Sequence, residues 1–167
     1  QIKVHVSRLS VFFFQDHGSS QTVSFSRFFQ HDIHTNDSDI YPGAGYGGSC
    51  FPKDVRALKH LAQSKGCQAS ILTAVHDTNQ RQKNKPAERV IERLGANLSG
   101  KTVAVWGLSF KPNTDDIREA PSLSLLEHIW SCGGSVRAFD PEAMAVCHEL
   151  YGDRDDMTYV ENKYDAL

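Results

Sequence analysis

The sequence has no long apolar run, few cysteines and no excess of charge of one sign. Its longest early apolar run is Val11-Phe12-Phe13-Phe14, far short of the roughly 18 apolar residues that a membrane helix needs. We therefore expect no membrane span and a cytoplasmic protein. Eighteen Lys and Arg against 20 Asp and Glu give a net charge of -2, so no broad basic field is available for a nucleic-acid partner.

Cysteine and histidine patterns exclude two further classes of protein. The four cysteines form no CxxC pair, and four are too few for a disulfide scaffold in a chain of 167 residues. The eight histidines show no spacing typical of metal ligands, so we expect no metal site.

Composition changes near residue 40. Residues 1–39 contain no Ala, no Glu and one Leu, but six of the nine Phe. Neither a period of two nor a period of 3.6 runs through them, so this irregular segment stays unassigned. We divide the chain into this segment, a glycine and cysteine loop with a central helical segment at 40–98, and a Rossmann-like segment at 99–167.

Regular spacing in the central segment predicts two helices. Pro52 suits the first position of a helix that continues to Ser64. Apolar residues at helical spacing from Ile71 predict a second, longer helix that ends around Gly95, with a break or kink at Pro86. A helix of that length usually bridges domains or subunits, so we expect a homodimer through it.

The last segment alternates strands with helices. The pattern predicts strands at 101–106, 135–139 and 157–160, with helices at 122–132 and 141–150. Such alternation is typical of a parallel sheet. The expected fold class is therefore α/β: a helical dimerisation segment followed by a partial Rossmann-like parallel sheet with an open edge.

A glycine-rich loop precedes the first helix; we call residues 43–50 the Cys loop. Gly43, Gly45 and Gly48 satisfy GxGxxG, but Pro42 precedes them, no clear strand leads in, and no acidic residue follows about 20 positions later. We interpret the glycines as a tight loop that brings backbone close to a ligand, and not as a dinucleotide-binding turn.

Cys50 lies between the Cys loop and the helix start. An isolated cysteine is more often buried and inert, but the positive end of the helix dipole and nearby Lys53 favour the thiolate here. Cys50 is therefore a candidate nucleophile, and Asp54 is a candidate to orient water or accept a proton. We expect the other cysteines to be core residues: Cys67, Cys132 and Cys147.

Two groups of basic residues occur further along the chain. Residues 107–119 follow a predicted strand and form a loop, which we call the 107–119 loop. It lies at the carboxyl edge of the predicted sheet, where ligands of such folds bind. Lys111 and Arg118 in it are candidate phosphate-reading cations; the alternative is solvated charges paired with Asp115, Asp116 or Glu119. The other group is expected to form the solvent-exposed face of the long helix: Arg81, Lys83, Lys85, Arg89 and Arg93.

Two of these motifs resemble one enzyme family. Residues 41–58, from Tyr-Pro-Gly-Ala-Gly-Tyr-Gly-Gly-Ser-Cys-Phe-Pro-Lys-Asp to Leu58, closely resemble the catalytic signature of UDP-glucose 6-dehydrogenases, and residues 107–121 resemble their nucleotide-sugar loop. The resemblance covers roughly residues 40–167 and marks 99–167 as the UDP-sugar-binding domain. It implies oxidation of UDP-glucose at C6 to UDP-glucuronate, with NAD as cofactor.

The resemblance also implies roles for individual residues. Cys50 would attack the intermediate aldehyde, forming a thiohemiacetal and then a thioester, while Asp54 would assist proton transfer. Lys53 and Arg118 would contact NAD, and Lys111 would contact the substrate. The UDP-sugar pocket would be lined by Tyr41, Pro42, Gly43, Gly47 and Phe51.

Alternatives stay open at this point. Members of the family carry an NAD-binding domain before the Cys loop, and residues 1–39 do not resemble it, so we expect this chain alone to be a catalytically crippled fragment. Sister enzymes acting on GDP-mannose or UDP-N-acetyl sugars share the architecture. A non-catalytic nucleotide-sugar-binding or dimerisation fragment is the other alternative.

Overall fold

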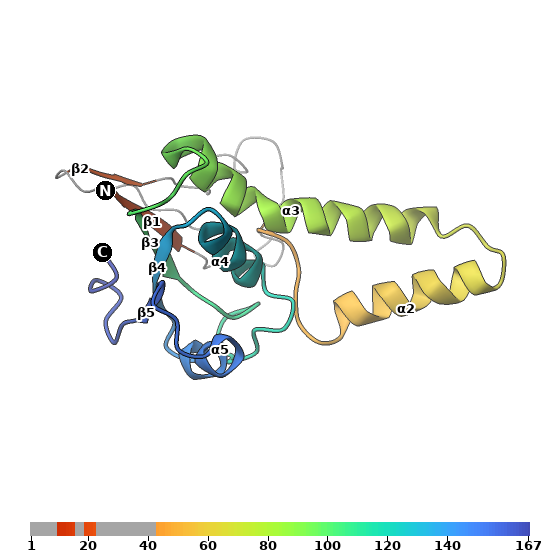
Figure 1. Cartoon of the computed structure of the whole chain (residues 1–167). Helices are drawn as coiled ribbons and strands as arrows, with labels where there is room; N and C mark the ends of the chain where they lie inside the picture. Colours follow the sequence, from red (N-terminus) through yellow and green to blue (C-terminus); the bar gives the residue numbers. More distant parts are fainter. Residues whose placement is uncertain (1–9, 16–18, 23–42) are drawn as a thin grey trace, which may run out of the picture.

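A sheet with helices on one side and a projecting pair of helices make up the structure (Figure 1). It is a computed structural model that describes residues 10–15, 19–22 and 43–167. Along the chain the elements are β1 (Ser10–Gln15), β2 (Ser19–Thr22), α2 (Phe51–Ser64), α3 (Ser70–Leu94), β3 (Thr102–Trp106), α4 (Pro121–Ser131), β4 (Ser135–Phe139), α5 (Met144–Tyr151) and β5 (Met157–Tyr159).

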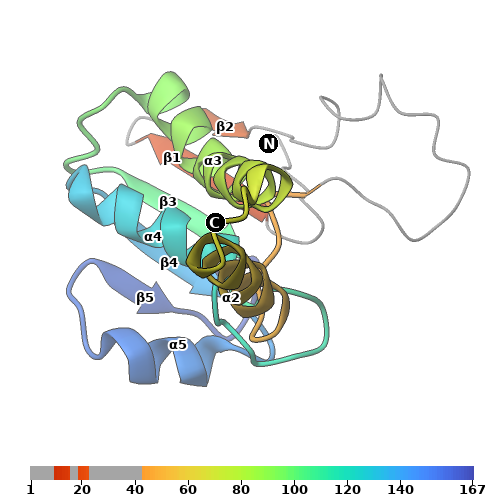
Figure 2. The same cartoon turned by 90° about the vertical axis from the view of Figure 1, so that its right-hand side faces the viewer.

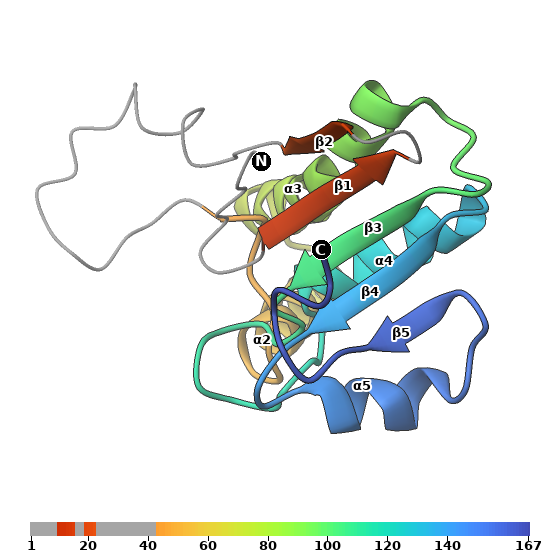
Figure 3. The ribbon, with the colours of Figure 1, turned by 90° about the vertical axis from the view of Figure 1, so that its left-hand side faces the viewer.

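The five strands lie in the order β2-β1-β3-β4-β5 (Figure 3). Strands β3, β4 and β5 are parallel, with Val103 paired to Val136 and Val136 to Met157. This confirms the predicted parallel sheet and its three strands, and β5 is the last strand on its side of the sheet among the residues that the structure describes. Strands β1 and β2 are antiparallel additions beside β3, in a segment where the phenylalanine run has no alternation from which a strand could be predicted.

The helices α3, α4 and α5 lie on the same side of the sheet (Figure 2). Parallel strands need such crossover helices, and α4 turns a fully buried face toward the sheet through Leu125, Leu126 and Ile129. On the opposite side of the sheet, Trp106 packs with Ala104 and Ala166 from the C-terminal segment. The sheet therefore holds the 107–119 loop at its carboxyl edge, between β3 and α4.

Helices α2 and α3 form a hairpin that projects from the sheet layer (Figure 1). Sequence analysis predicts a break or kink at Pro86, but α3 is continuous over Ser70–Leu94, so the prediction of a break is wrong. Pro86, Ala87 and Val90 are buried, and α3 packs on α4 there. Burial of this apolar face offsets the one backbone hydrogen bond that proline lacks.

None of the described helices combines the length and the apolar character that a membrane crossing requires.

Candidate functional site

The Cys loop lies along α3 and is held there by side-chain amides. The Asn79 side chain accepts a hydrogen bond from the Tyr46 backbone N–H at 2.8 Å and donates one to the Tyr46 carbonyl oxygen at 3.1 Å. Gln82 donates to the carbonyl oxygen of Gly43 at 2.7 Å. Asn79 is buried, so the loop backbone takes the place of water as its partner.

The opposite side of the Cys loop contacts the 107–119 loop. The backbone N–H of Gly48 donates to the carbonyl oxygen of Arg118 at 2.7 Å. A Cβ atom on Gly47 would lie 2.5 Å from the carbonyl oxygen of Glu119, and one on Gly48 would lie 2.8 Å from the Phe110 ring. The space beside these glycines is therefore filled by protein atoms, and the two motifs found in the sequence form one surface.

Cys50 stands at the N-terminus of α2, as the sequence predicts, and is exposed. Its Sγ lies 3.6 Å from the Ser49 hydroxyl. The Asp54 N–H donates to the Cys50 carbonyl oxygen at 2.8 Å, which places Asp54 in the first turn of the helix. Its carboxylate is 3.4 Å from the Lys53 ammonium, and both side chains are about two-thirds exposed. The helix start thus offers a thiol and a carboxylate to solvent or ligand.

Two aromatic rings pack together at the start of α2. Tyr46 and Phe51 meet edge to face with ring centroids 4.6 Å apart, and Phe51 is 57% exposed. Burial raises the pKa of Tyr46, and its hydroxyl oxygen is buried without a hydrogen-bond partner in the part of the chain that the structure describes. Phe51, the residue that follows Cys50, therefore presents an exposed apolar surface.

The start of the 107–119 loop is fixed by Asp140, at the end of β4. One carboxylate oxygen of Asp140 accepts from the N–H groups of Leu108 and Ser109, at 2.7 and 3.3 Å. The other accepts from the N–H groups of Glu142 and Ala143, at 2.9 Å each. Four backbone donors on one buried carboxylate make this a rigid support for the residues that follow.

Lys111 and Arg118 extend from this loop. Lys111 is exposed, with its ammonium 5.3 Å from the centroid of the Phe110 ring. Arg118 donates to both carboxylate oxygens of Asp116, at 2.8 and 2.7 Å. This pairing lowers the pKa of Asp116, so for Arg118 the predicted alternative of a local ion pair is present.

Arg118 nevertheless keeps capacity for an anion. Its Nη1 has no hydrogen-bond partner among the described residues, and the side chain is 67% exposed. The hydrogen bonds to the Asp116 carboxylate raise the pKa of Arg118. Exposed donors on a guanidinium are suited to bind a phosphate or carboxylate group.

Sequence analysis missed the residues that join the two loops. The Glu119 carboxylate accepts hydrogen bonds from Arg56 at 2.6 Å and Lys83 at 2.8 Å. Lys83 was expected on the exposed face of α3, but it is only 3% exposed, so that prediction is wrong. Asn79, Gln82 and Lys83 recur at helical spacing, and this polar stripe was the available signal.

The remaining predictions concern the other cysteines, two pocket residues and metal ligands. Cys147 is buried in the core and Cys132 packs against it, as predicted, but Cys67 is exposed at the end of the hairpin, which corrects that prediction. Tyr41 and Pro42 lie outside the described residues. Among the residues that are described, no three His, Cys, Asp or Glu side chains gather closely enough to hold a metal ion.

Comparison with known protein families identifies both parts of this site. The UDP-glucose/GDP-mannose dehydrogenase central domain matches residues 22–81, which include the Cys loop. The UDP binding domain of the same family matches residues 104–167, which include the 107–119 loop. The chain belongs to the UDP-glucose/GDP-mannose dehydrogenase family. It is thus a member of a family of oxidoreductases that act on nucleotide sugars.

Relatives within this family share both sequence and fold. A UDP-glucose 6-dehydrogenase of Pseudomonas aeruginosa is 56% identical over 106 residues, which are 64% of this chain and 23% of the relative. The solved UDP-glucose dehydrogenase of the hyperthermophilic archaeon Pyrobaculum islandicum has a TM-score of 0.70 and 38% identity, covering 75% of this chain and 28% of that one. The GDP-mannose dehydrogenase of Pseudomonas aeruginosa has a TM-score of 0.52 and 31% identity, covering 69% and 24%. The chain therefore spans about a quarter of the length of these relatives.

Proposed function

We propose that this chain carries the cysteine and nucleotide-sugar part of an NAD-dependent UDP-glucose 6-dehydrogenase, which oxidises UDP-glucose at C6 to UDP-glucuronate. The observation that carries the proposal is the hydrogen bond from the Gly48 N–H to the Arg118 carbonyl oxygen, 2.7 Å long. It joins the Cys loop to the loop of the UDP binding domain, which supports a surface shared by the thiol and the proposed sugar-nucleotide site.

Cys50 and Asp54 would perform the covalent chemistry. Sγ of Cys50 adds to the carbonyl carbon of the intermediate aldehyde and later holds the acyl group as a thioester. Water then cleaves the carbon–sulfur bond, which releases the carboxylate and returns the thiol, with Asp54 receiving the proton from water. Two NAD molecules, bound one after the other, would each accept one of the two hydrides that leave the substrate carbon.

Exposed cations at the start of α2 and on the 107–119 loop support the binding roles. Lys53 and Arg118 are proposed to meet the NAD phosphates, and Lys111 the substrate. The UDP-sugar pocket is proposed to include Tyr41, Pro42, Gly43, Gly47 and Phe51. The exposed ring of Phe51 next to Cys50 fits the apolar face of a sugar ring.

Two properties of the whole protein complete the proposal. We propose a homodimer through the α2–α3 hairpin, because the hairpin exposes large apolar side chains: Leu58, Leu61, Ile71 and Val75. We also propose a cytoplasmic location, where the four free cysteines stay reduced.

Cysteine alkylation with and without nucleotide sugar tests the proposed function. Rates for Cys50, Cys67 and Cys147 are measured by mass spectrometry after timed treatment with iodoacetamide. We expect Cys50 to react faster than Cys67, although both are exposed, and UDP-glucose to change the Cys50 rate alone. Identical rates for the two exposed thiols, with no response to UDP-glucose, would contradict the proposal and favour a non-catalytic module.

Titration with different nucleotide sugars separates the remaining alternatives. UDP-glucose, GDP-mannose and a UDP-N-acetyl sugar are each added to the same alkylation assay. The proposal expects UDP-glucose to act at the lowest concentration. A stronger response to GDP-mannose would favour the activity that names the 31% identical relative.

A further inference from the structure

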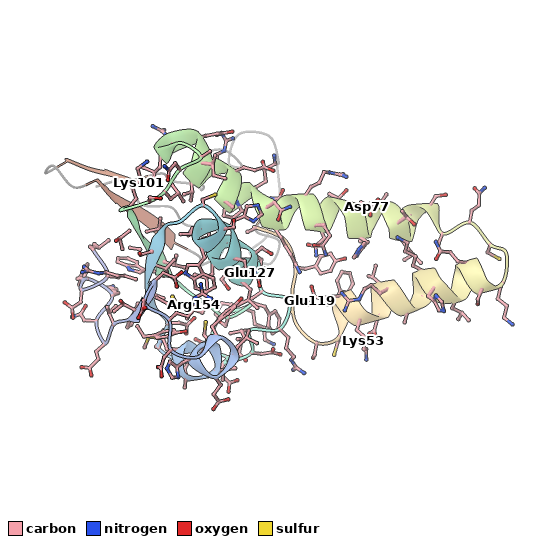
Figure 4. The ribbon with its side chains drawn as sticks, in the orientation of Figure 1. Lys53, Asp77, Lys101, Glu119, Glu127 and Arg154 are labelled. Carbon is pink, nitrogen blue, oxygen red and sulfur yellow. The ribbon has the colours of Figure 1, made fainter. Side chains whose placement is uncertain are left out.

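One carboxylate joins three parts of the molecule. Oε1 of Glu119 accepts a hydrogen bond from Nη1 of Arg56 at 2.6 Å, and Oε2 accepts one from Nζ of Lys83 at 2.8 Å. Arg56 belongs to α2, Lys83 to α3, and Glu119 to the loop between β3 and α4. We call these three residues the Glu119 junction. It lies where the hairpin meets the sheet layer (Figure 4).

Lys83 is buried and depends on Glu119 for its opposite charge. Its side chain is 4% exposed, and an ammonium group removed from water needs an opposite charge. The Glu119 carboxylate supplies that charge. The stem of Lys83 also passes the Cys loop, because a Cβ atom on Gly45 would lie 3.1 Å from Lys83 Cγ. The same lysine therefore contacts the Cys loop and binds Glu119.

The backbone at Glu119 contacts the other side of the Cys loop. Glu119 has a φ of 56°, a left-handed conformation that non-glycine residues rarely adopt and that persists only when surrounding contacts hold it. In this conformation the preceding carbonyl oxygen accepts from the Gly48 N–H, and the Glu119 carbonyl lies against Gly47. The two ion pairs of the side chain and these backbone contacts therefore meet at one strained residue.

We infer that Glu119 is a positioning residue for Cys50. Through Arg56 and Lys83 it fixes the 107–119 loop against the backbone that leads into the thiol. Glu119 itself touches none of the reacting atoms. The inference rests on the proposed function, since it concerns the geometry of the same cysteine.

A substitution that keeps size but removes charge tests this role. In Glu119→Gln the side chain has one oxygen acceptor in place of two, so it fails to accept from both cations. The matched control is Glu88→Gln, which removes a carboxylate from the exposed Lys85–Glu88 pair of α3. Both variants are made in the full 167-residue chain.

The readout is the ratio of Cys50 to Cys67 alkylation by iodoacetamide, without NAD or nucleotide sugar. Cys67 is exposed and lies at the far end of the hairpin (Figure 1), so it calibrates the reagent. Cys147 is fully buried, so its protection shows that a variant is folded. We expect the ratio to fall at least about threefold in Glu119→Gln, because the 107–119 loop and its cations are no longer held against the Cys loop. Glu88→Gln is expected to leave it unchanged.

Equal ratios in the two variants, with Cys147 protected in both, would overturn the inference. If Cys147 becomes reactive in Glu119→Gln, that variant is not correctly folded. The half-exposed ion pair between Arg56 and Glu119 is then tested through Arg56→Gln and Arg56→Lys. If Arg56→Gln lowers the Cys50 to Cys67 ratio and Arg56→Lys restores it, the positioning role is supported. If the two variants give the same ratio, the inference is overturned. This measurement needs no ligand. If UDP-glucose does not change the Cys50 alkylation rate, the proposed function is refuted, but the effect of Glu119→Gln on the ratio can still be measured.

Discussion

Gly47 packs so closely on Glu119 that a Cβ atom at position 47 would stand 2.5 Å from the Glu119 carbonyl oxygen. The obstructing atoms belong mostly to backbone, which does not swing aside as a flexible side chain does. The Cys loop and the 107–119 loop therefore fit together only when residue 47 has no side chain.

Gly47→Ala is expected to lower the free energy of unfolding by about 1–3 kcal/mol, because it overpacks this contact. Urea unfolding measures the loss, and the Cys50 to Cys67 alkylation ratio should change with it. The control is Gly66→Ala, at a residue with a φ of +71° and open space around it, which adds conformational strain without a clash. An unchanged alkylation ratio in Gly47→Ala would contradict the close-contact explanation.

Asn79→Ala is expected to cost about 2 kcal/mol or more of unfolding free energy, because it leaves the N–H and the carbonyl of Tyr46 without partners. Urea unfolding followed by circular dichroism gives the value. Gln80→Ala, at an exposed neighbour on the same helix, should change stability by less than about 0.5 kcal/mol. Equal effects of the two substitutions would show that the hydrogen bonds between Asn79 and Tyr46 do not contribute measurably to stability.

Acid should weaken the Glu119 junction selectively. Lys83 and Arg56 hold the pKa of Glu119 below its usual range, so its contribution to stability is present above the unfolded-state value of about 4.3 and is lost as pH falls through the folded-state value. The stability difference between the unaltered chain and Glu119→Gln should therefore be largest above about pH 5 and shrink below about pH 4. Urea unfolding across this range checks the trend; a constant difference would speak against it.

A charge on the hairpin should weaken the proposed dimer. Ile71 is 79% exposed, and Ile71→Glu places a carboxylate where an apolar contact is proposed. We expect the dissociation constant to rise at least about tenfold in sedimentation experiments. Gln68→Glu, which adds a charge to an already polar exposed site, should have little effect. An unaltered chain that sediments as a monomer at every concentration would reject the dimer.

Much of the secondary structure was predictable because its signals are local. Pro52 near the start of α2, the apolar spacing along α3 and the alternating strands and helices after residue 100 all occur in the structure. Local signals failed at Pro86, where packing against α4 keeps α3 continuous. They also failed at β1 and β2: β1 pairs with β3 and β2 pairs with β1, although neither segment has a recognisable alternation.

The sequence by itself determined where the two motifs are and which elements carry them, since both depend on the order and spacing of neighbouring residues. Only the tertiary structure decided how the motifs meet. Asn79 holds Tyr46 across 33 positions of the chain, and Lys83 reaches Glu119 across 36. A lysine at position 83 is buried only because a carboxylate from a distant loop arrives to neutralise it, and no local pattern encodes that arrival.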